Sequence, residues 1–188
     1  MSIERLHHPT IKLLCGNGLD LPNQAARARA TWLPRREGQP AVLLVALLWA
    51  RECTDVVRSL ESYLDGLLAD CCCTPGGWSE AQAARQVLAA FNQQLFRQRQ
   101  AGRSIAQLNA GLLLLQNGEA QFLQAGAIGL RRYQGGTTQS LIGRDGLQLG
   151  AQAELALVQH SLPLSQGAAL LLAPQPLLEV ADLQSFRL

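Results

Sequence analysis

The stretch AVLLVALLW at residues 41–49 contains no charged side chain. A strand that is buried on both faces has this composition, whereas a half-exposed strand alternates apolar and polar residues. Residues that favour turns precede it, beginning at Pro34 and ending at Pro40. We therefore predict a central strand at residues 41–49, covered on both of its faces.

Two helices are predicted to follow this strand. Residues 53–68 carry apolar side chains three and four positions apart, which is the spacing of one helical face. Ser79 and Gln82 have the spacing of a capping box, so the second helix should begin there and end near Gly102. Its predicted buried stripe is Ala84, Val87, Leu88, Phe91 and Leu95. The opposite face is interpreted as solvated and carries Arg85, Gln93, Gln94, Arg97, Gln98 and Arg99.

Shorter strands are predicted on both sides of the helical pair. The Asn117-Gly118 pair is typical of a β-hairpin turn and should join strands at residues 104–116 and 119–125. The other predicted elements are strands at 11–15, 28–33, 130–133, 137–142, 153–158 and 168–173, and a short helix at 177–186. This order predicts a layered α+β domain, with sheets covered by the helical pair, and we expect residues 1–188 to form a single domain.

Composition excludes several classes of protein. The chain has 188 residues, with 16 basic and 14 acidic side chains, so no concentrated basic surface and no nucleic-acid partner are expected. Hydrophobic residues make up 48% and charged residues 16%, which excludes a disordered chain. No apolar run is long enough for membrane insertion. The N-terminus lacks the apolar stretch of a signal peptide, which predicts a cytoplasmic protein.

Cysteine and histidine suggest little chemistry. The five cysteines are Cys15, Cys53, Cys71, Cys72 and Cys73. Three consecutive cysteines point in divergent directions and do not suit one tetrahedral ion, so we interpret residues 71–78 as a connection with incidental thiols. His160 could act as a base for Cys15 or Cys53, but we interpret it as a loop residue. No metal and no cofactor is predicted.

Two further motifs have simple structural interpretations. Residues 135–138 (GGTT) could form a phosphate-binding nest, but their place between two predicted strands favours a hairpin turn. Arg131, Arg132 and Arg144 could bind a small anion, and we interpret them as solvated.

Four phrases follow one another along the chain: Asn23-Gln24-Ala25 after Gly18, VALL at residues 45–48, GAIG at 126–129, and GAALLLAPQPL at 167–177. In order and spacing they resemble four phrases of the metal-dependent serine/threonine phosphatases of the protein phosphatase 2C (PPM) type. These are Asn-Glu-Asp, Val-Ala-Asp-Gly, Gly-Asp-Ser-Arg and Gly-Asp-x-Leu-Leu-Leu-x-Ser-Asp-Gly-Leu. The resemblance runs from about residue 10 to the end and implies an antiparallel β-sandwich of two sheets flanked by helices.

The polar residues of the family phrases are replaced in this sequence. In the family, aspartates at these places hold two divalent cations that bind phosphate and generate the attacking hydroxide. The positions that correspond here are Ala25, Leu47, Ala127 and Gln175, and Leu48 replaces a glycine. The chain also ends before the family's last Asp-Asn phrase and closing strand. The resemblance therefore implies a degenerate member, truncated at its C-terminus, that lacks the metal-binding aspartates.

Three hypotheses about function follow. The first is a catalytically inactive pseudophosphatase that binds a protein partner or itself as a regulatory or scaffolding subunit. The second is a metal-dependent phosphoprotein phosphatase or other hydrolase with a remodelled site, or with ligands from a partner chain. The third is a self-associating structural subunit. The aspartates are scattered, which favours the first hypothesis: Asp20, Asp55, Asp65, Asp70, Asp145 and Asp182.

The expected contact region of such a subunit lies near the C-terminus. A missing closing strand would leave a sheet edge open to pairing. The apolar pair Leu177 and Leu178 follows the last predicted strand and is expected to be exposed beside that edge.

Overall fold

The structure, a computed structural model, describes residues 23–34, 40–52, 56–73, 77–103, 106–116, 118–142 and 146–180. Its strands form two antiparallel sheets, one in the order β1-β2-β3-β4-β7 and one in the order β6-β5-β8. The larger sheet contains β1 Gln24–Trp32, β2 Leu43–Arg51, β3 Gln107–Gln116, β4 Glu119–Ala125 and β7 Val158–Pro163. The smaller sheet contains β5 Ile128–Gln134, β6 Thr137–Ile142 and β8 Ala169–Pro174. The helices are α1 Val56–Cys72, α2 Glu80–Gln100 and α3 Gln175–Val180.

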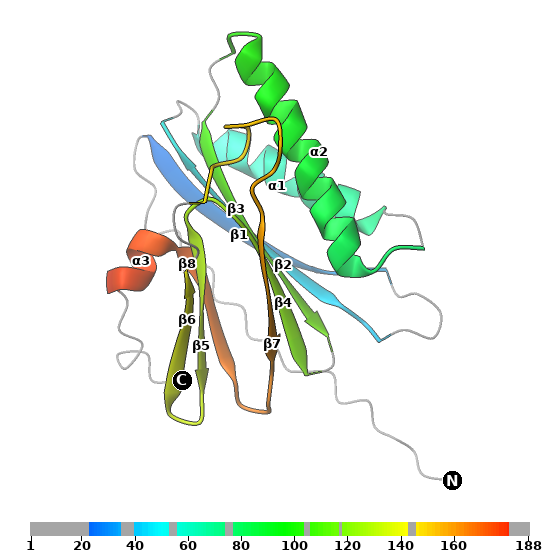
Figure 1. Ribbon diagram of the computed structural model, residues 1–188, viewed down its shortest axis with the longest axis vertical. Coiled ribbons are helices and arrows are strands. Elements are labelled where there is room, and N and C mark those ends of the chain that lie inside the picture. Colours follow the sequence, from blue (N-terminus) through cyan, green and yellow to red (C-terminus); the bar gives the residue numbers. More distant parts are fainter. Residues whose placement is uncertain are drawn as a thin grey trace.

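The two sheets face each other, and α1 and α2 cover the outer face of the larger one (Figure 1). The predicted α+β sandwich flanked by helices is confirmed. The predicted strand at residues 11–15 and the following glycine turn lie outside the described residues. No helix in the described ranges combines the length and the apolar character needed to cross a membrane.

The central strand β2 explains why the apolar run is uninterrupted. Its odd-numbered side chains enter a core between the two sheets, the inter-sheet core. Its even-numbered side chains enter a second core beneath α1 and α2, the helix-side core. Every residue from Leu43 to Ala50 is therefore buried, as the sequence predicts. The strand ends at Arg51, two residues later than predicted.

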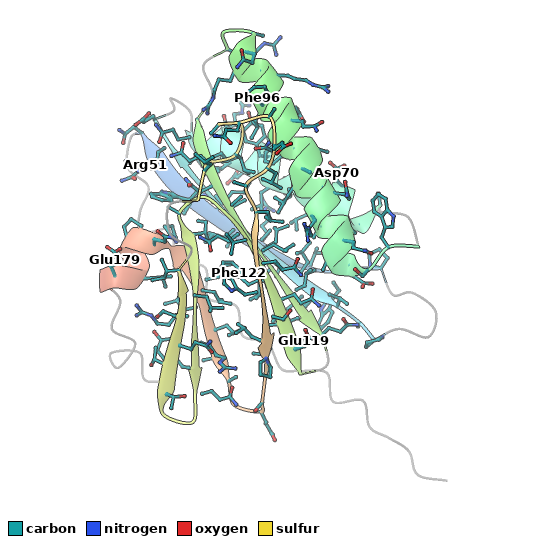
Figure 2. The ribbon with its side chains drawn as sticks, in the orientation of Figure 1. Arg51, Asp70, Phe96, Glu119, Phe122 and Glu179 are labelled. Atoms are coloured by element: carbon teal, nitrogen blue, oxygen red, sulfur yellow. The ribbon has the colours of Figure 1, made fainter. Side chains whose placement is uncertain are left out.

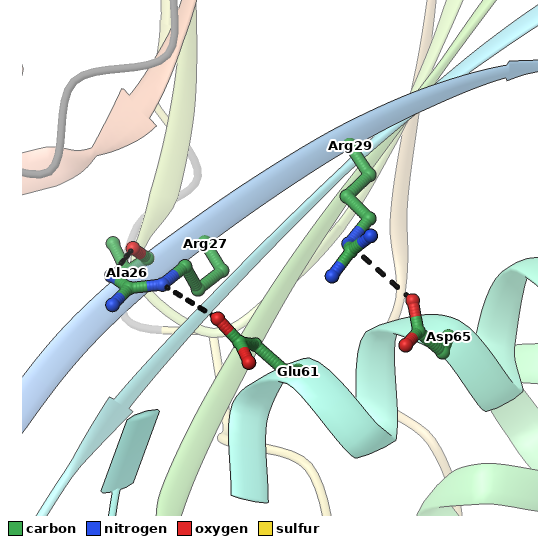
Figure 3. A network of polar contacts seen from close by, with 5 residues as sticks. All are labelled: Ala26, Arg27, Arg29, Glu61 and Asp65. Carbon is green, nitrogen blue, oxygen red and sulfur yellow. Dashed lines mark hydrogen bonds and ion pairs between the residues drawn. The ribbon is translucent and has the colours of Figure 1, made fainter. Parts of the chain in front are cut away.

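Helix α1 is oriented across β1 by two ion pairs (Figure 3). Arg27 Nε lies 3.6 Å from Glu61 Oε1, and Arg29 Nε lies 3.4 Å from Asp65 Oδ1. The two arginines are two positions apart on one face of a strand, and the two carboxylates are four positions apart on one face of a helix. This match of spacings fixes the register between the helix and the strand.

Helix α2 begins as predicted. The Ser79 side chain accepts a hydrogen bond from the Gln82 N–H, and the Gln82 side chain accepts one from the Ser79 N–H, which completes the capping box. The buried stripe differs from the predicted one: Ala83 is also buried, and Phe91 is only partly buried, with its ring centroid 5.3 Å from that of Tyr63. Asn92 is buried in its place, with 2% of its surface exposed.

A glycine inside α1 offers a test of the helix. Gly66 is exposed, and a Cβ built there would meet nothing within 4 Å. Gly66→Ala should therefore raise the free energy of unfolding by about 0.5–1 kcal/mol, because alanine has less conformational entropy to lose. Chemical denaturation with an unchanged m-value would measure this. Gly102→Ala is the control: Gly102 also has open space around it, but its φ of +73° strains an alanine, so stability should fall. An equal gain in both variants would contradict the assignment.

The predicted strand at residues 153–158 is wrong. The strand in this region is β7, which begins only at Val158. Before it, the Asn92 side-chain amide donates hydrogen bonds to the carbonyl oxygens of Gln152 (3.0 Å) and Ala153 (3.2 Å). The carbonyl of Ala153, at the start of the predicted strand, and that of Gln152 just before it are thus bound to α2, and regular strand pairing begins only at Val158.

Other elements are present with shifted bounds: β1 begins at Gln24, four residues before the strand predicted at 28–33, and α1 runs from Val56 to Cys72 instead of 53–68. Gly135 and Gly136 have φ angles of 54° and 75° and form the predicted hairpin turn between β5 and β6. Helix α3 begins at Gln175, two residues earlier than predicted, because Pro176 is tolerated in the first turn of a helix. The predicted continuation of this helix to residue 186 lies outside the described residues.

Candidate functional site: a polar cluster at one end of the sandwich

Strand ends from both sheets meet at one end of the molecule. In the larger sheet, Gln24 at the start of β1 pairs with Arg51 at the end of β2, and Arg51 pairs with Gln107 at the start of β3. The turn between β4 and β5 and the junction of β8 with α3 lie at the same end. We call the following residues the sheet-end cluster: Gln24, Arg51, Glu52, Gln107, Asn109, Ala127 and Gln175.

Asn109 is the centre of this cluster and is 1% exposed. Its Nδ2 donates to the Trp49 carbonyl (3.3 Å), and its Oδ1 accepts from the Ala127 N–H (2.9 Å). The Gln175 N–H in turn donates to the Ala127 carbonyl (3.0 Å). The structure thus brings together two of the positions selected from the sequence, Ala127 and Gln175. Asn109, which holds the first of them, was not anticipated.

The end of β2 adds two charged residues. Glu52 has a φ of 58° and is the one non-glycine residue with positive φ in the described part of the chain. The Gln107 side-chain amide donates to Glu52 Oε2, and the Gln148 amide donates to Gln107 Oε1 (2.9 Å). The guanidinium of Arg51 lies over the Trp49 ring, 5.5 Å from its centroid.

Leu47 and Leu48 do not lie in the cluster. Leu47 is in the middle of β2, where it pairs with Ala28 and Gly111 and points into the inter-sheet core. Leu48 is fully buried in the helix-side core. Strand β2 ends at Arg51, and Glu52 directly after it adopts the positive-φ conformation that favours glycine.

Ala25 is also separated from Leu47. It is 1% exposed, pairs with Ala50, and belongs to the helix-side core, whereas Leu47 belongs to the inter-sheet core. The two side chains therefore lie on opposite faces of the same sheet. Its neighbour Gln24, which pairs with Arg51, is the residue of that phrase that enters the sheet-end cluster.

The described side chains of the cluster do not fit a pair of divalent cations. Magnesium and manganese require several oxygen ligands with concentrated negative charge. The cluster offers neutral amides, one guanidinium and one carboxylate, that of Glu52. In the described ranges, no three His, Cys, Asp or Glu side chains are grouped as metal ligands. Asp20, Asp55, Asp145 and Asp182 lie outside the described residues.

The apolar pair Leu177 and Leu178, expected to be an exposed contact region, is not exposed in the structure. Leu178 is fully buried, and its Cδ1 would lie 2.6 Å from a Cβ built at Gly129. The Arg131 guanidinium also donates to the Leu178 carbonyl. Leu178 is therefore a packing residue of α3 and not an exposed contact, and Leu177 is half-buried. Among the described strands β8 pairs only with β5, so it forms an edge of the smaller sheet.

His160 and the arginine pair also have structural roles. His160 lies in β7 and not in a loop, with its ring stacked on Phe122 at a centroid distance of 6.2 Å. Arg131 Nε donates to the Ser140 hydroxyl at 3.1 Å, and Arg132 donates to the Pro163 carbonyl at 2.7 Å. Neither arginine is merely solvated. Cys15, Cys53 and Arg144 lie outside the described residues.

The three consecutive cysteines differ in exposure. Helix α1 continues through Cys72, so the predicted connection begins later than residue 71. Cys71 is 4% exposed, and burial raises the pKa of its thiol to about 12. Burial also raises the pKa of Cys72, while Cys73 is exposed. The three thiols thus point in different directions and form no shared site.

Thiol labelling should follow this order. With iodoacetamide at neutral pH, Cys73 should react first, Cys72 more slowly, and Cys71 only after unfolding, because the thiolate is the reactive form and must be reached by the reagent. All three lie in the tryptic fragment from residue 59 to residue 85, whose fragment ions locate each label. Early labelling of Cys71 in the folded protein would contradict the packing of α1.

Comparisons with known proteins identify the fold through solved structures and not through sequence matches. No family model matches the sequence, and no curated protein matches it. PppA of Pseudomonas aeruginosa, described as a key regulatory component of its T6SS, matches with a TM-score of 0.61 and 20% identity, over 84% of this chain and 80% of that one. The serine/threonine phosphatase of S. agalactiae matches with a TM-score of 0.59 and 11% identity, over 79% and 78%.

A third solved structure carries metal. The catalytic domain of the serine/threonine protein phosphatase PstP, in complex with 2 manganese ions, matches with a TM-score of 0.53 and 13% identity, over 87% of this chain and 82% of that one. At these identities the matches establish the fold, which is that of the protein phosphatase 2C type.

Proposed function

We propose that this chain, whose fold is that of the protein phosphatase 2C-type enzymes, is a non-hydrolytic regulatory or scaffolding subunit that binds another protein. The observation that carries the proposal is the content of the sheet-end cluster. Ala127 and Gln175, which we take as two of the positions that correspond to metal-binding aspartates, are joined there by a backbone hydrogen bond, and the end of β2 presents Arg51. We place the strand-end position of the family phrase at Arg51 and Glu52.

Electrostatics supports the absence of metal chemistry. Two-metal hydrolysis needs a site whose carboxylates offset the dehydration of the cations. An arginine at such a position places a fixed positive charge where a cation would bind, because guanidinium stays protonated at all physiological pH values. The one carboxylate of the cluster, that of Glu52, accepts a hydrogen bond from Gln107.

A regulatory role is consistent with two of the solved structures that share this fold. PppA is described as a regulatory component, and another structure with this fold comes from the bacterial stressosome. We propose a regulatory role for this chain, without assigning it to a particular pathway. We place the protein in the cytoplasm and expect it to bind a protein partner or a second copy of itself, with the edge of β8 as one available contact.

The alternative is a metal-dependent phosphatase with a remodelled site, and Glu52 is the observation that favours it. Its carboxylate lies in the sheet-end cluster and its backbone adopts a conformation that is costly for a residue other than glycine. Such local strain is often found at functional sites.

Hydrolysis of p-nitrophenyl phosphate and of a phosphothreonine peptide, with Mn²⁺ or Mg²⁺ at millimolar concentration, tests the two functions. We expect no turnover above the rate without protein, and capture of a protein partner that EDTA does not affect. Metal-dependent turnover that is lost in Glu52→Ala would establish the alternative. A strictly monomeric chain that captures no partner and turns over no substrate would contradict the proposed function.

A further inference from the structure

We infer that the C-terminal end of α2 and the residues after it form a docking surface for an acidic segment of the partner protein. We call Arg97, Arg99 and Arg103 the cationic end of α2. This inference rests on the proposed function, since it names the chemistry of the partner and the surface that binds it. The sequence alone suggests only that Arg97 and Arg99 lie on a solvated helix face.

The charge of this segment is one-sided. From Ala81 to Arg103 the chain contains four arginines and no aspartate or glutamate. Over the whole chain the two signs are nearly balanced, with 16 basic and 14 acidic residues. Three of the four arginines fall within the last seven residues of this segment, and Arg97 and Arg103 are exposed. The imbalance is therefore local and lies on the surface.

These arginines differ from others in the chain in their contacts with the described residues. Arg27 and Arg29 on β1 form ion pairs with Glu61 and Asp65 of α1. By contrast, the guanidinium groups of the cationic end make no hydrogen bond or ion pair with any part of the chain that the structure describes. Their hydrogen-bond donors remain available to a carboxylate, which the planar guanidinium can bind through two parallel bonds.

Helix capping alone does not account for the arrangement. A cation in the last turn of a helix is stabilised by the helix dipole, by less than about 1 kcal/mol at an exposed site. The other long helix, α1, nevertheless ends with no basic residue in its last turn. The basic end of α2 is thus a feature of this helix and not a general requirement of the fold.

The position of the surface links it to the sheet-end cluster. Figure 2 shows Phe96, near the end of α2, and Arg51 at the same end of the molecule. The loop that contains Gln148 and Gly150 contacts both regions. Its Gln148 side chain bonds to Gln107 of the cluster, and its Gly150 N–H donates to Asn92 Oδ1 of α2 (2.8 Å). A partner bound to the cationic end of α2 would therefore lie at the same end of the molecule as the cluster.

A protein segment fits this surface better than a nucleic acid. Binding to a phosphate backbone gains its affinity from the neutralisation of many phosphates by a broad basic surface. Three arginines at the end of one helix, on a chain with a net charge of +2, cover only a short stretch. Short acidic segments carry charges on this scale, and glutamine side chains nearby, such as Gln98 and Gln100, can bond to their carboxylates.

Fluorescence anisotropy with a labelled polyglutamate peptide of about twelve residues tests the inference, with the full-length protein at about 50 mM salt, where exposed charges are weakly screened. We expect saturable binding that weakens as salt is raised. Arg97→Glu/Arg103→Glu should weaken it at least about tenfold. Arg58→Glu/Arg85→Glu reverses the same number of charges elsewhere on the helices and should weaken it less than about threefold.

Each outcome is informative. Equal losses in the two variants would show that only net charge matters and would overturn the inference, as would tighter binding of a single-stranded DNA of equal charge. Circular dichroism and the thermal midpoint show that both variants fold. If the chain captures its protein partner equally well with Arg97→Glu/Arg103→Glu, the docking surface is refuted while the proposed function stands. Metal-dependent phosphatase activity would refute the function and leave the peptide measurement unaffected.

Discussion

Asn92→Ala is expected to lower the free energy of unfolding by about 3 kcal/mol, because it removes the partners of three backbone groups in one loop. The Asn92 side chain donates to the carbonyls of Gln152 and Ala153 and accepts from the Gly150 N–H. The side chain is 2% exposed, so water cannot readily replace these bonds. Urea or guanidinium denaturation measures the change.

The neighbouring position supplies the control. Gln93→Ala alters an exposed side chain of the same helix and should change stability by less than about 0.5 kcal/mol. Asn92→Asp keeps an acceptor for Gly150 but loses the donor to the two carbonyls and introduces a buried charge, so it should destabilise at least as much as alanine. A loss below about 1 kcal/mol in Asn92→Ala would contradict the assigned role of the loop.

Gly126→Ala is expected to cost about 3 kcal/mol, since it combines backbone strain with a clash. Gly126 has a φ of +78°, and a Cβ there would lie 2.2 Å from Asn109 Oδ1. That oxygen accepts the Ala127 N–H, so displacing it would also disturb the sheet-end cluster. The thermal midpoint and the free energy of unfolding should both fall.

Gly135→Ala separates the two causes. Gly135 also has a positive φ, of 54°, but a Cβ there would meet nothing within 4 Å. It should therefore show only the backbone strain, about 1 kcal/mol. Equal losses at the two glycines would mean that the contact between Gly126 and Asn109 contributes nothing.

The sequence predicts correctly those parts of the fold where the local pattern of residues matches their burial or hydrogen bonding in the structure. The apolar run at residues 41–49 is buried on both faces because each face has a core of its own. Ser79 and Gln82 form the capping box that their spacing predicts. The strand from Glu119 to Ala125 has the predicted bounds, since Gly118, with its positive φ, fixes the turn before it.

Misassignments arose where distant residues decide the structure. The alternating apolar pattern at residues 153–158 resembles a strand, and Leu155 and Leu157 do pack on the helix-side core. Nothing local indicates that Asn92, some sixty residues earlier, binds the carbonyls of this segment. A single buried asparagine on a helix thus overrides the local pattern.

The candidate site was only partly predictable for a related reason. The apolar run at residues 41–49 contains no polar residue that would fix which of its positions corresponds to the aspartate of the family phrase. We propose the charged pair Arg51 and Glu52, which follows the run, as the signal that fixes this correspondence. Leu178 was expected at the surface because its contact with Gly129, across the smaller sheet, is not visible in the sequence.

Isothermal titration of the full-length protein with Mn²⁺ tests most directly whether the chain lacks a metal centre. The full chain includes Asp20 and Asp145, which lie outside the described residues, so the titration tests every carboxylate present. We predict no saturable heat up to millimolar metal, for the wild type and for Glu52→Ala alike. A site of micromolar affinity in the wild type would contradict the account of this protein as a non-hydrolytic subunit.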